Sequence, residues 1–416
     1  MSRALWPALL PPARQGDDRL CAVSARGVRV RFADGRELLC GTSGLWNANL
    51  GYGNSVISAA ASQALRDASY LSVFRAENSY ARAAAAALIA SCGARHFGRV
   101  IFSTSGGAAN DLAMKLVRQY HHLRGQDQRK LVVGLRGSFH GLTFGAFSLT
   151  GEQLGQHTYG VDQRLIRHVM ANDPDELAVL LERQGPRIAA VVVEPVLGSG
   201  TIPLREDYVR ALLAARDTVG FLVVADEVAT GFGRTGPLFA TDLWPDRPDL
   251  LIASKGLTNG VSAAAAVIVS QQVSAEFDAD HAMLTHAETQ AGTPVTCAAI
   301  LATLGEFERL AALESGRRVA AQLDEHLAEL AASHPFVSTT TGVGCFRSIQ
   351  VRARDGAPLS QVDVPTLVAK VRELGALVYP GPNGIQLVPA LVYTDAEVDE
   401  LMHCVRAGLD CVGTGL

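Results

Sequence analysis

Short hydrophobic runs alternate with longer segments of helical periodicity through the middle of the chain. The runs contain almost no polar residue, as expected of strands that are buried on both faces of a sheet. They lie at residues 99–102, 131–134, 188–193, 221–225, 250–253 and 265–269. Between them, amphipathic patterns predict helices, for example at 108–121, 174–184 and 205–219. This alternation predicts an α/β fold with a mostly parallel central sheet and ligands at the carboxyl ends of its strands.

The two ends of the chain have a different pattern, in which short strands and helices follow without regular alternation. Strand-like segments are predicted at 21–40, 337–354 and 385–388, and helices at 310–333 and 364–374. We therefore expect a small α+β domain that both termini form together. Its two parts would be residues 1–55 and 309–416, and residues 56–308 would make the large domain.

Composition excludes several classes of function. The 416 residues are 48% hydrophobic and carry a net charge of −4, which gives no electrostatic reason to expect nucleic acid or an anionic membrane as a partner. The seven cysteines are odd in number and form no CxxC pair, as is typical of reduced thiols in a cytoplasmic protein. The longest hydrophobic stretches are shorter than the roughly 20 residues that cross a bilayer. His121 and His122 lack metal-ligand spacing, so we expect no metal site.

Two of the predicted strands end in residues suited to carbonyl chemistry. Lys255 follows the run 250–253, and Asp226 follows the run 221–225. A lysine against hydrophobic surroundings has a lowered pKa and becomes a nucleophile toward carbonyl groups. An aspartate on a neighbouring strand can keep a pyridine nitrogen protonated, which is the arrangement that pyridoxal phosphate (PLP) requires. Either residue alone is more often a solvated charge at a strand end.

Two further strand ends carry candidate binding groups. Ser105, Gly106 and Gly107 follow one strand and open a helix, where free backbone N–H groups and the helix dipole favour a phosphate. N-capping alone also explains such a turn. Phe139 and His140 follow the next strand, where a flat cofactor could stack on the phenylalanine ring; a core phenylalanine beside a hydrogen-bonded histidine is the other interpretation.

The order of these motifs resembles the class III (subgroup II) aminotransferases, which depend on PLP. The segment 226–236, DEVATGFGRTG, is similar to the signature of that family. Other matching segments occur in the family's order: GLWN at 44–47, GYG at 51–53, the turn at 105–107, FHG at 139–141, EPV at 194–196, SKG at 254–256, and Thr289. The resemblance spans nearly the whole chain.

The resemblance implies the type I PLP-dependent transferase fold and a homodimer with active sites shared between subunits. Lys255 would bond to PLP and later move a proton between the substrate and the cofactor, and Asp226 would pair with the pyridine nitrogen. The remaining residues would contact the phosphate, the two faces of the ring, or the residues that hold the cofactor. They are Ser105, Gly106, Gly107, Phe139, His140, Glu194, Val228 and, from the other subunit, Thr289. Trp46 would line the substrate pocket.

Departures from the family pattern bear on the substrate. Many relatives hold a substrate α-carboxylate with an arginine at one of two places that Tyr379 and Gln386 occupy here. A phenol or an amide does not replace a guanidinium fork. Without that arginine, Glu194 could hold a positively charged substrate amine. Alternatively, Arg347 or Arg352 could supply the fork from another position.

We therefore expect a PLP-dependent aminotransferase that moves an amino group by ping-pong chemistry from an amine donor to an aldehyde or ketone acceptor. The acceptor would lack an adjacent carboxylate, as in diamine and ω-amine transfer or in the tailoring of a secondary metabolite or modified peptide. Two alternatives share the motifs: a PLP-dependent 2,1-aminomutase, and a non-catalytic subunit with the PLP fold.

Overall fold

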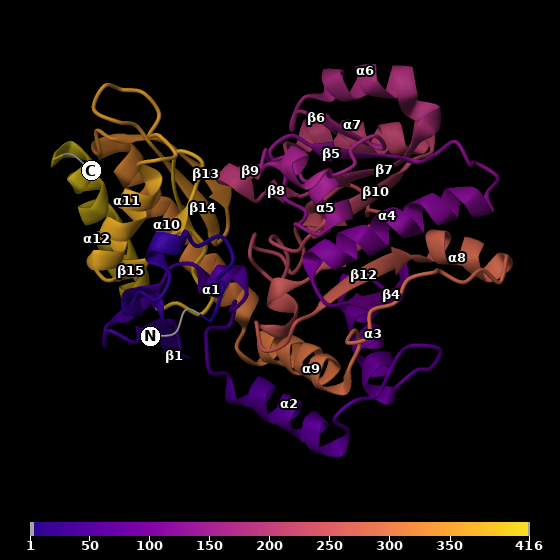
Figure 1. The fold of residues 1–416 in the computed structure, drawn as a ribbon, viewed down its shortest axis with the longest axis horizontal. Helices are drawn as coiled ribbons and strands as arrows, with labels where there is room; N and C mark the ends of the chain where they lie inside the picture. The colour runs from indigo at the N-terminus through magenta and orange to yellow at the C-terminus, as the bar shows by residue number, and fades with distance from the viewer. Residues whose placement is uncertain (1–3, 415–416) are drawn as a thin grey trace.

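A twisted sheet of seven strands forms the centre of the protein, and a smaller lobe lies beside it (Figure 1). The structure is a computed structural model and describes residues 4–414. The strand order is β4-β12-β11-β10-β7-β5-β6, and only β12 runs against its neighbours. The seven strands are β4 (Phe97–Ser103), β5 (Leu131–Leu135), β6 (Ile166–Val169), β7 (Ile188–Val193), β10 (Leu222–Asp226), β11 (Leu250–Ala253) and β12 (Ala265–Ser270). The mostly parallel sheet predicted from the hydrophobic runs is confirmed.

The pattern missed β6, the strand at the sheet edge. Its two central residues, Arg167 and His168, are only half-buried because no further strand covers them on that side. An edge strand needs fewer hydrophobic residues than a central one, so its sequence lacks the signal that identified the others.

Helices cover both faces of the sheet. The buried residues of α4 (Gly106–Leu123) pack on one face, and those of α6 (Pro174–Gln184) and α7 (Glu206–Val219) pack on the other. Three further helices, α2 (Ser55–Asp67), α3 (Ser79–Cys92) and α9 (Pro294–Arg309), pack together below β4 in Figure 1. The short helix α5 (Phe144–Leu149) and α8 (Gln271–Ala279) follow β5 and β12. Both faces of the sheet are therefore closed to solvent, and its strand ends remain available for a ligand.

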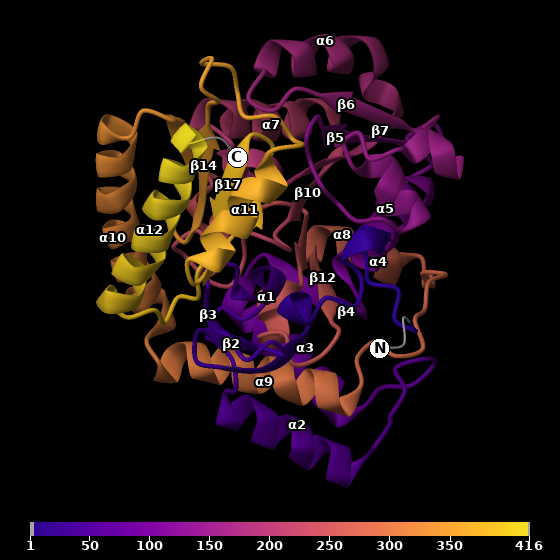
Figure 2. The same cartoon turned by 60° about the vertical axis from the view of Figure 1, so that its left-hand side comes forward.

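The smaller lobe joins the two ends of the chain. Strands β1 (Ala22–Arg26), β2 (Arg29–Phe32) and β3 (Glu37–Cys40) form a sheet with β15 (Ala376–Leu377) from near the other end. A second sheet contains β13 (Val337–Val343), β14 (Phe346–Val351), β17 (Gly384–Leu387) and β16 (Tyr379–Pro380). Helices α10 (Ala312–Ser333), α11 (Val364–Glu373) and α12 (Asp395–Asp410) cover these sheets, as the turned view shows (Figure 2). The domain boundaries 1–55, 56–308 and 309–416 stay a prediction.

Arg234 ties three distant parts of the chain together. Its side chain is fully buried and has no carboxylate partner. The guanidinium donates to the carbonyl oxygens of Cys345 and Pro389 and to Asn49 Oδ1, the last at 2.6 Å. These acceptors come from the N-terminal segment, from the loop before β14 and from the segment after β17. Among residues 4–414, no helix combines the length and the apolar character that a membrane span requires.

Replacing Arg234 by alanine should destabilise the fold. The change leaves several buried acceptors without a donor, and each such loss costs about 1–3 kcal/mol. We expect the free energy of unfolding, measured by urea denaturation of the cofactor-free protein, to fall by more than about 2 kcal/mol. Arg164, an exposed arginine that pairs with Asp162, provides the control, because solvent screens its ion pair and its replacement should leave stability nearly unchanged. Equal effects of the two substitutions would contradict the structural role of Arg234.

Candidate active site

The polar residues that the sequence singled out meet at one edge of the central sheet. Ser105 follows β4, His140 follows β5, Glu194 follows β7, Asp226 ends β10, and Lys255 follows β11. All five of these strands run in the same direction, so their carboxyl ends form one wall. The sheet topology thus brings together side chains that are up to 150 residues apart in the sequence (255 − 105).

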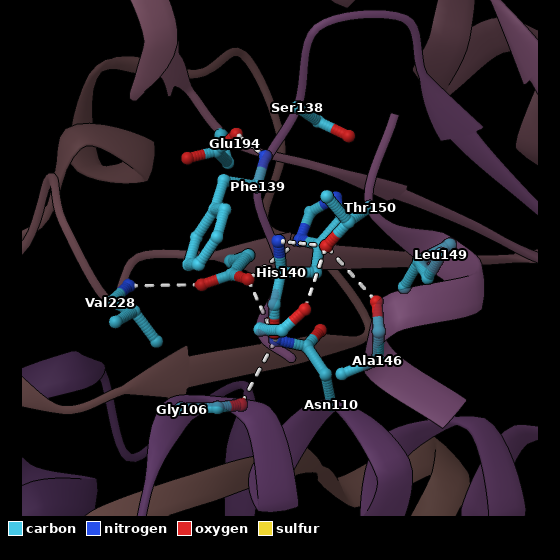
Figure 3. A network of polar contacts seen from close by, with 12 residues as sticks. Gly106, Asn110, Ser138, Phe139, His140, Ala146, Leu149, Thr150, Glu194 and Val228 are labelled. Atoms are coloured by element: carbon cyan, nitrogen blue, oxygen red, sulfur yellow. Dashed lines mark hydrogen bonds and ion pairs between the residues drawn. The ribbon is translucent and has the colours of Figure 1, made fainter. Parts of the chain in front are cut away.

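Asp226 is held by three hydrogen bonds at this edge. Its carboxylate is buried, and Oδ2 accepts hydrogen bonds from Asn110 Nδ2 at 2.8 Å and from His140 Nδ1 at 2.7 Å. Oδ1 accepts from the backbone N–H of Val228 at 3.1 Å. Figure 3 shows this network between the start of α4 and the turn after β5. The position of the carboxylate is therefore fixed from three directions.

His140 supports the negative charge of Asp226. Burial lowers the pKa of His140, but the hydrogen bond to Asp226 and the charge of that carboxylate outweigh it and leave the pKa raised. The Nε2 atom of the ring is buried and has no partner among residues 4–414. The hydrogen bond between the two buried side chains holds the imidazole ring against the Asp226 carboxylate.

The surroundings of Lys255 alter the pKa of its ammonium group. Burial of its ammonium group lowers its pKa to about 8, although the charges of Glu194 and Asp226 act in the opposite direction. Its Nζ atom is 4.1 Å from the centre of the Trp46 ring, so the indole face contacts the lysine directly. A lysine with this pKa is partly neutral near physiological pH, as a nucleophile requires.

A strained segment of backbone positions Trp46. Ser43, Gly44, Leu45 and Trp46 form the turn labelled α1 (Ser43–Trp46), and all four have positive φ angles, of 45°, 55°, 61° and 68°. Each left-handed non-glycine residue costs roughly 1–2 kcal/mol. The turn is held by the Ser43 hydroxyl, which donates to the carbonyl oxygen of Val388 at 2.6 Å. Strain of this kind persists where the surrounding structure enforces it, often at functional sites.

The phosphate turn has free donors. Ser105 caps α4, and its side chain accepts from the N–H of Ala108 at 3.2 Å. The N–H groups of Gly106 and Gly107 have no acceptor among residues 4–414, as expected at the first turn of a helix. Gly107 lies against Gly141, because a Cβ atom added to Gly141 would be 2.5 Å from the Cα of Gly107. The open N–H pair suits a phosphate, and the glycines allow the two turns to touch.

Glu288 and Asn110 contribute contacts that sequence reasoning did not assign. Glu288 accepts from the backbone N–H of Thr104 at 3.0 Å and from the hydroxyl groups of Ser103 and Thr104. It therefore holds the segment before the phosphate turn from a distant part of the chain. Asn110 donates to Asp226 and to the carbonyl oxygens of Gly106 and His140. The position of Asn110 one helical turn into α4 was the only sequence signal for its role.

Thr289 is the one predicted cofactor residue that lies apart from this network. Its side chain is exposed, and its carbonyl oxygen accepts from the Tyr70 hydroxyl at 2.9 Å. Its expected contact with a phosphate in another subunit stays a prediction. Figure 3 shows Phe139 between Glu194 and Val228 in that view, and a Cβ atom on Gly106 would meet Val228 at 3.0 Å. The contacts of Phe139 and Val228 with the cofactor ring stay a prediction.

Comparison with known proteins identifies the family. The family model for class III aminotransferases matches residues 12–409. The chain belongs to the class III aminotransferases. It is 29% identical over 409 residues to diaminobutyrate–2-oxoglutarate transaminase of Halomonas elongata, covering 91% of this chain and 87% of that protein. It is 28% identical to putrescine–pyruvate aminotransferase of Pseudomonas aeruginosa, covering 93% of this chain and 89% of that protein.

Solved structures agree with this assignment. An amine transaminase from an uncultivated Pseudomonas species, solved with PLP, is 27% identical and superposes with a TM-score of 0.93 over 99% of this chain and 100% of that one. An (S)-enantioselective ω-transaminase from Thermomicrobium roseum is 28% identical, with a TM-score of 0.92 over 98% and 96%. The type I fold, the dependence on PLP and the transaminase class, each predicted from the motifs, are confirmed.

The site of this class III aminotransferase fits its cofactor. The free N–H groups of Gly106 and Gly107 would bind the phosphate, Asp226 would hold the pyridine nitrogen, and Lys255 would reach the reactive carbon. When bound, PLP supplies a carbonyl carbon and an electron-withdrawing ring, which allow an amino group to leave one substrate and enter another. Lys255 holds or releases the proton at Nζ, and Asp226 keeps its charge through Asn110 and His140. Phe139 and Val228 would restrict the orientation of the ring.

The lowered pKa of Lys255 predicts a pH dependence. The free amine forms as the pH rises through about 8, rather than near the ordinary value of about 10.4. Reductive methylation of the cofactor-free aminotransferase, followed by mass spectrometry, should therefore show half-maximal labelling of Lys255 near pH 8. Exposed Lys130 in the same digest provides the comparison. The same pH profile at both residues would contradict the effect of burial.

Removing Asn110 should weaken the hold on the cofactor. Asn110→Ala takes a hydrogen bond from a buried carboxylate, a contact worth about 1.5–3 kcal/mol, so the Kd for PLP should rise roughly ten- to a hundredfold. Equilibrium dialysis read by cofactor absorbance measures this directly. Asn383→Ala is the matched control, since the side chain of Asn383 donates to the carbonyl oxygen of Leu359 and not to a carboxylate. Unchanged PLP affinity in Asn110→Ala would show that Asp226 does not need this donor.

Proposed function

We propose that this aminotransferase acts on an amine or a carbonyl compound that lacks a carboxylate beside the reacting carbon. The observation that carries the proposal is that two family positions for an arginine hold other residues and that the arginines nearby bind other groups. Tyr379 and Gln386, at the two places where relatives hold an α-carboxylate, are direct partners across β16 and β17. Tyr379 lies edge-on to Trp46 at 5.3 Å, and Gln386 donates to the carbonyl oxygen of Gly198 at 2.6 Å. Neither group offers a cation.

Arg347 does not replace the missing arginine. Its guanidinium donates to the carbonyl oxygens of Gly344 and Gly342 and pairs with Asp324 at 2.6 Å. Phe346, its neighbour on β14, packs on Trp46 with ring centres 5.0 Å apart. Because side chains alternate along a strand, Arg347 points away from the face that Trp46 covers.

Arg352 is also directed elsewhere. Its guanidinium donates to the carbonyl oxygen of Val337 at 3.3 Å. It follows the end of β14, six residues beyond Phe346 (352 − 346), which is roughly 20 Å along an extended chain. These contacts favour the substrate that needs no guanidinium fork, and they speak against the alternative that Arg347 or Arg352 supplies one.

Glu194 adds a negative group to the same pocket. Its two oxygens accept from the backbone N–H groups of Phe139, at 2.9 Å, and Gly198, at 3.1 Å. Burial raises the pKa of Glu194 to about 7, and no cation pairs with it among residues 4–414. A Cβ atom on Gly198 would lie within 3.5 Å of both Glu194 and Trp46, so the carboxylate stands beside the aromatic wall of the pocket. An acidic and aromatic pocket suits an amine better than an amino acid. The relative named for putrescine, a diamine without a carboxylate, is consistent with this class of substrate.

A pair of substrates that differ only in the carboxylate tests this proposal. L-Norvaline and butan-1-amine have the same carbon chain beyond the reacting carbon. We expect butan-1-amine to convert the bound cofactor at least as fast as L-norvaline, followed by cofactor absorbance in single half-reactions. Tyr379→Arg should raise the rate with L-norvaline about tenfold or more by providing a bidentate fork. Tyr379→Gln, which lacks the charge, is the matched control.

A strong preference of the wild-type enzyme for L-norvaline would overturn the proposal. The test requires no knowledge of the natural acceptor, because each half-reaction is observed separately. The expected homodimer with shared active sites is part of the same proposal, and sedimentation of the purified protein would measure it.

A further inference from the structure

The side chain of Glu288 holds the strand end that leads into the phosphate turn. One carboxylate oxygen, Oε2, accepts from the backbone N–H of Thr104 at 3.0 Å and from the hydroxyl of the same residue. The other, Oε1, accepts from the hydroxyl of Ser103, the last residue of β4. A ring nitrogen of His286 lies 3.4 Å from Oε1. Both oxygens therefore have partners, and three of the contacts go to the two residues directly before Ser105.

The phosphate turn itself has few side chains that could fix its position. Gly106 and Gly107 have none, and glycine loses more conformational freedom on ordering than any other residue. Ser105 uses its side chain to cap α4. The turn is therefore held from its two flanks. Asn110 donates to the carbonyl oxygen of Gly106 at 3.0 Å on one side, and Glu288 binds the residues before the turn on the other.

The segment that carries Glu288 is attached along α4. Gln119 Nε2 donates to the carbonyl oxygen of Met283 at 2.9 Å, and Lys115 Nζ donates to that of Thr285 at 2.6 Å. As the segment proceeds from 283 to 288, its partners run from 119 through 115 to 104, so it passes beside the helix in the opposite direction. Glu288 makes the contact at the end of α4 where the phosphate would bind.

Thr289 shares the anchors of Glu288, its neighbour in the chain. Its carbonyl oxygen is held by the Tyr70 hydroxyl, and Asn78 Nδ2 donates to the carbonyl oxygen of Gly292 at 3.0 Å. The backbone of Thr289 is thus fixed on both sides, while the residue remains exposed. In the homodimer of the proposed function, one carboxylate would then position groups for two cofactor sites.

The charge of Glu288 cannot itself attract a phosphate. Burial raises the pKa of Glu288, but the hydrogen bonds from Ser103 and Thr104 outweigh that effect and leave the pKa lowered. The carboxylate is therefore ionised at neutral pH, and two anions repel each other. Any gain in phosphate binding must come from the conformation that Glu288 imposes on the turn.

We propose that Glu288 is a positioning residue for the cofactor phosphate, which fixes Ser103 and Thr104 so that the free N–H groups of Gly106 and Gly107 keep the orientation that a phosphate requires. Glu288 makes no contact with the cofactor in this role. The inference goes beyond the proposed function, since it holds for any substrate, and only its extension to Thr289 rests on the proposed homodimer.

Two ligands that differ only in the phosphate test this role. Pyridoxal has the ring and the carbonyl group of PLP and lacks its phosphate. Equilibrium dialysis against the cofactor-free enzyme, read by absorbance, gives the Kd of each. We expect Glu288→Ala to raise the Kd for PLP about tenfold or more and to change the Kd for pyridoxal less than about twofold. Glu288→Gln can still accept the N–H of Thr104, so it should restore PLP binding to within about threefold of the wild type.

Inorganic phosphate, measured as a competitor of PLP, tests the same turn without the ring. Its inhibition constant should rise about tenfold in Glu288→Ala. Glu276→Ala is the matched control, because Glu276 on α8 pairs with Arg124 at 2.5 Å, directly after the last residue of α4. That contact is with the same helix, but at the far end of its 18 residues, about 27 Å from the phosphate turn. We expect Glu276→Ala to leave the Kd for PLP unchanged.

The outcomes separate this inference from the proposed function. Equal weakening of PLP and pyridoxal binding in Glu288→Ala would overturn the positioning role, since the whole site would then be disturbed. Unchanged PLP affinity in Glu288→Ala, or the same loss in Glu276→Ala, would also overturn it. A wild-type preference for L-norvaline would overturn only the proposed function, and a monomer in sedimentation would remove only the extension to Thr289. Thermal unfolding midpoints of the cofactor-free variants show whether each one folds.

Discussion

The buried carboxylate of Asp226 is the group around which the active site is organised. An ionised group at this depth is stable only when hydrogen bonds replace its water, and here they come from the first turns of α4, from the turn after β5 and from the backbone after β10. Each donor lies on or beside a segment that also contributes another part of the site. Asn110 lies on the phosphate helix, and His140 is next to the stacking residue Phe139 (Figure 3). Satisfying one charge therefore fixes the relative positions of the phosphate turn, the ring clamp and the strand that carries Asp226.

The second organising feature is the contact between Trp46 and Lys255. A left-handed turn places the indole face on the lysine. Contacts elsewhere in the fold compensate for the unfavourable backbone conformation of this turn. Ser43 is anchored to the segment after β17, and Phe346 of β14 also packs on the indole. The small lobe thus shapes the substrate side of the pocket, while the large sheet carries the cofactor side. The two halves meet at Lys255, where chemistry takes place.

The two ends of the site differ in their polar groups. The turn at Ser105, Gly106 and Gly107 presents free N–H groups, as an anionic phosphate would require. The other end contains Glu194, Trp46 and Tyr379, and Arg347 is engaged with carbonyl oxygens and with Asp324. Under the proposed function, these groups would favour a cationic substrate over one with an α-carboxylate.

The sequence by itself determined the family, the parallel sheet and the group of residues that meets at its edge. Hydrophobic runs identify buried strands locally, and the residue after each strand must lie at the same edge when the strands are parallel. It missed the edge strand β6, whose half-buried residues lack a hydrophobic pattern. The helix predicted at 310–333 begins at Ala312 in the structure, because Ala311 adopts a positive φ and separates α9 from α10.

Only the tertiary structure decided which charges face the pocket. Whether Arg347 points toward or away from Trp46 depends on the register of β14, and a shift of one residue would reverse it. Glu288 reaches the segment before the phosphate turn from a loop whose path no local pattern encodes, through a contact with a segment 184 residues away (288 − 104). Local periodicity fixes which side chains a strand or helix presents, but the partners of a loop side chain depend on the packing of the whole chain.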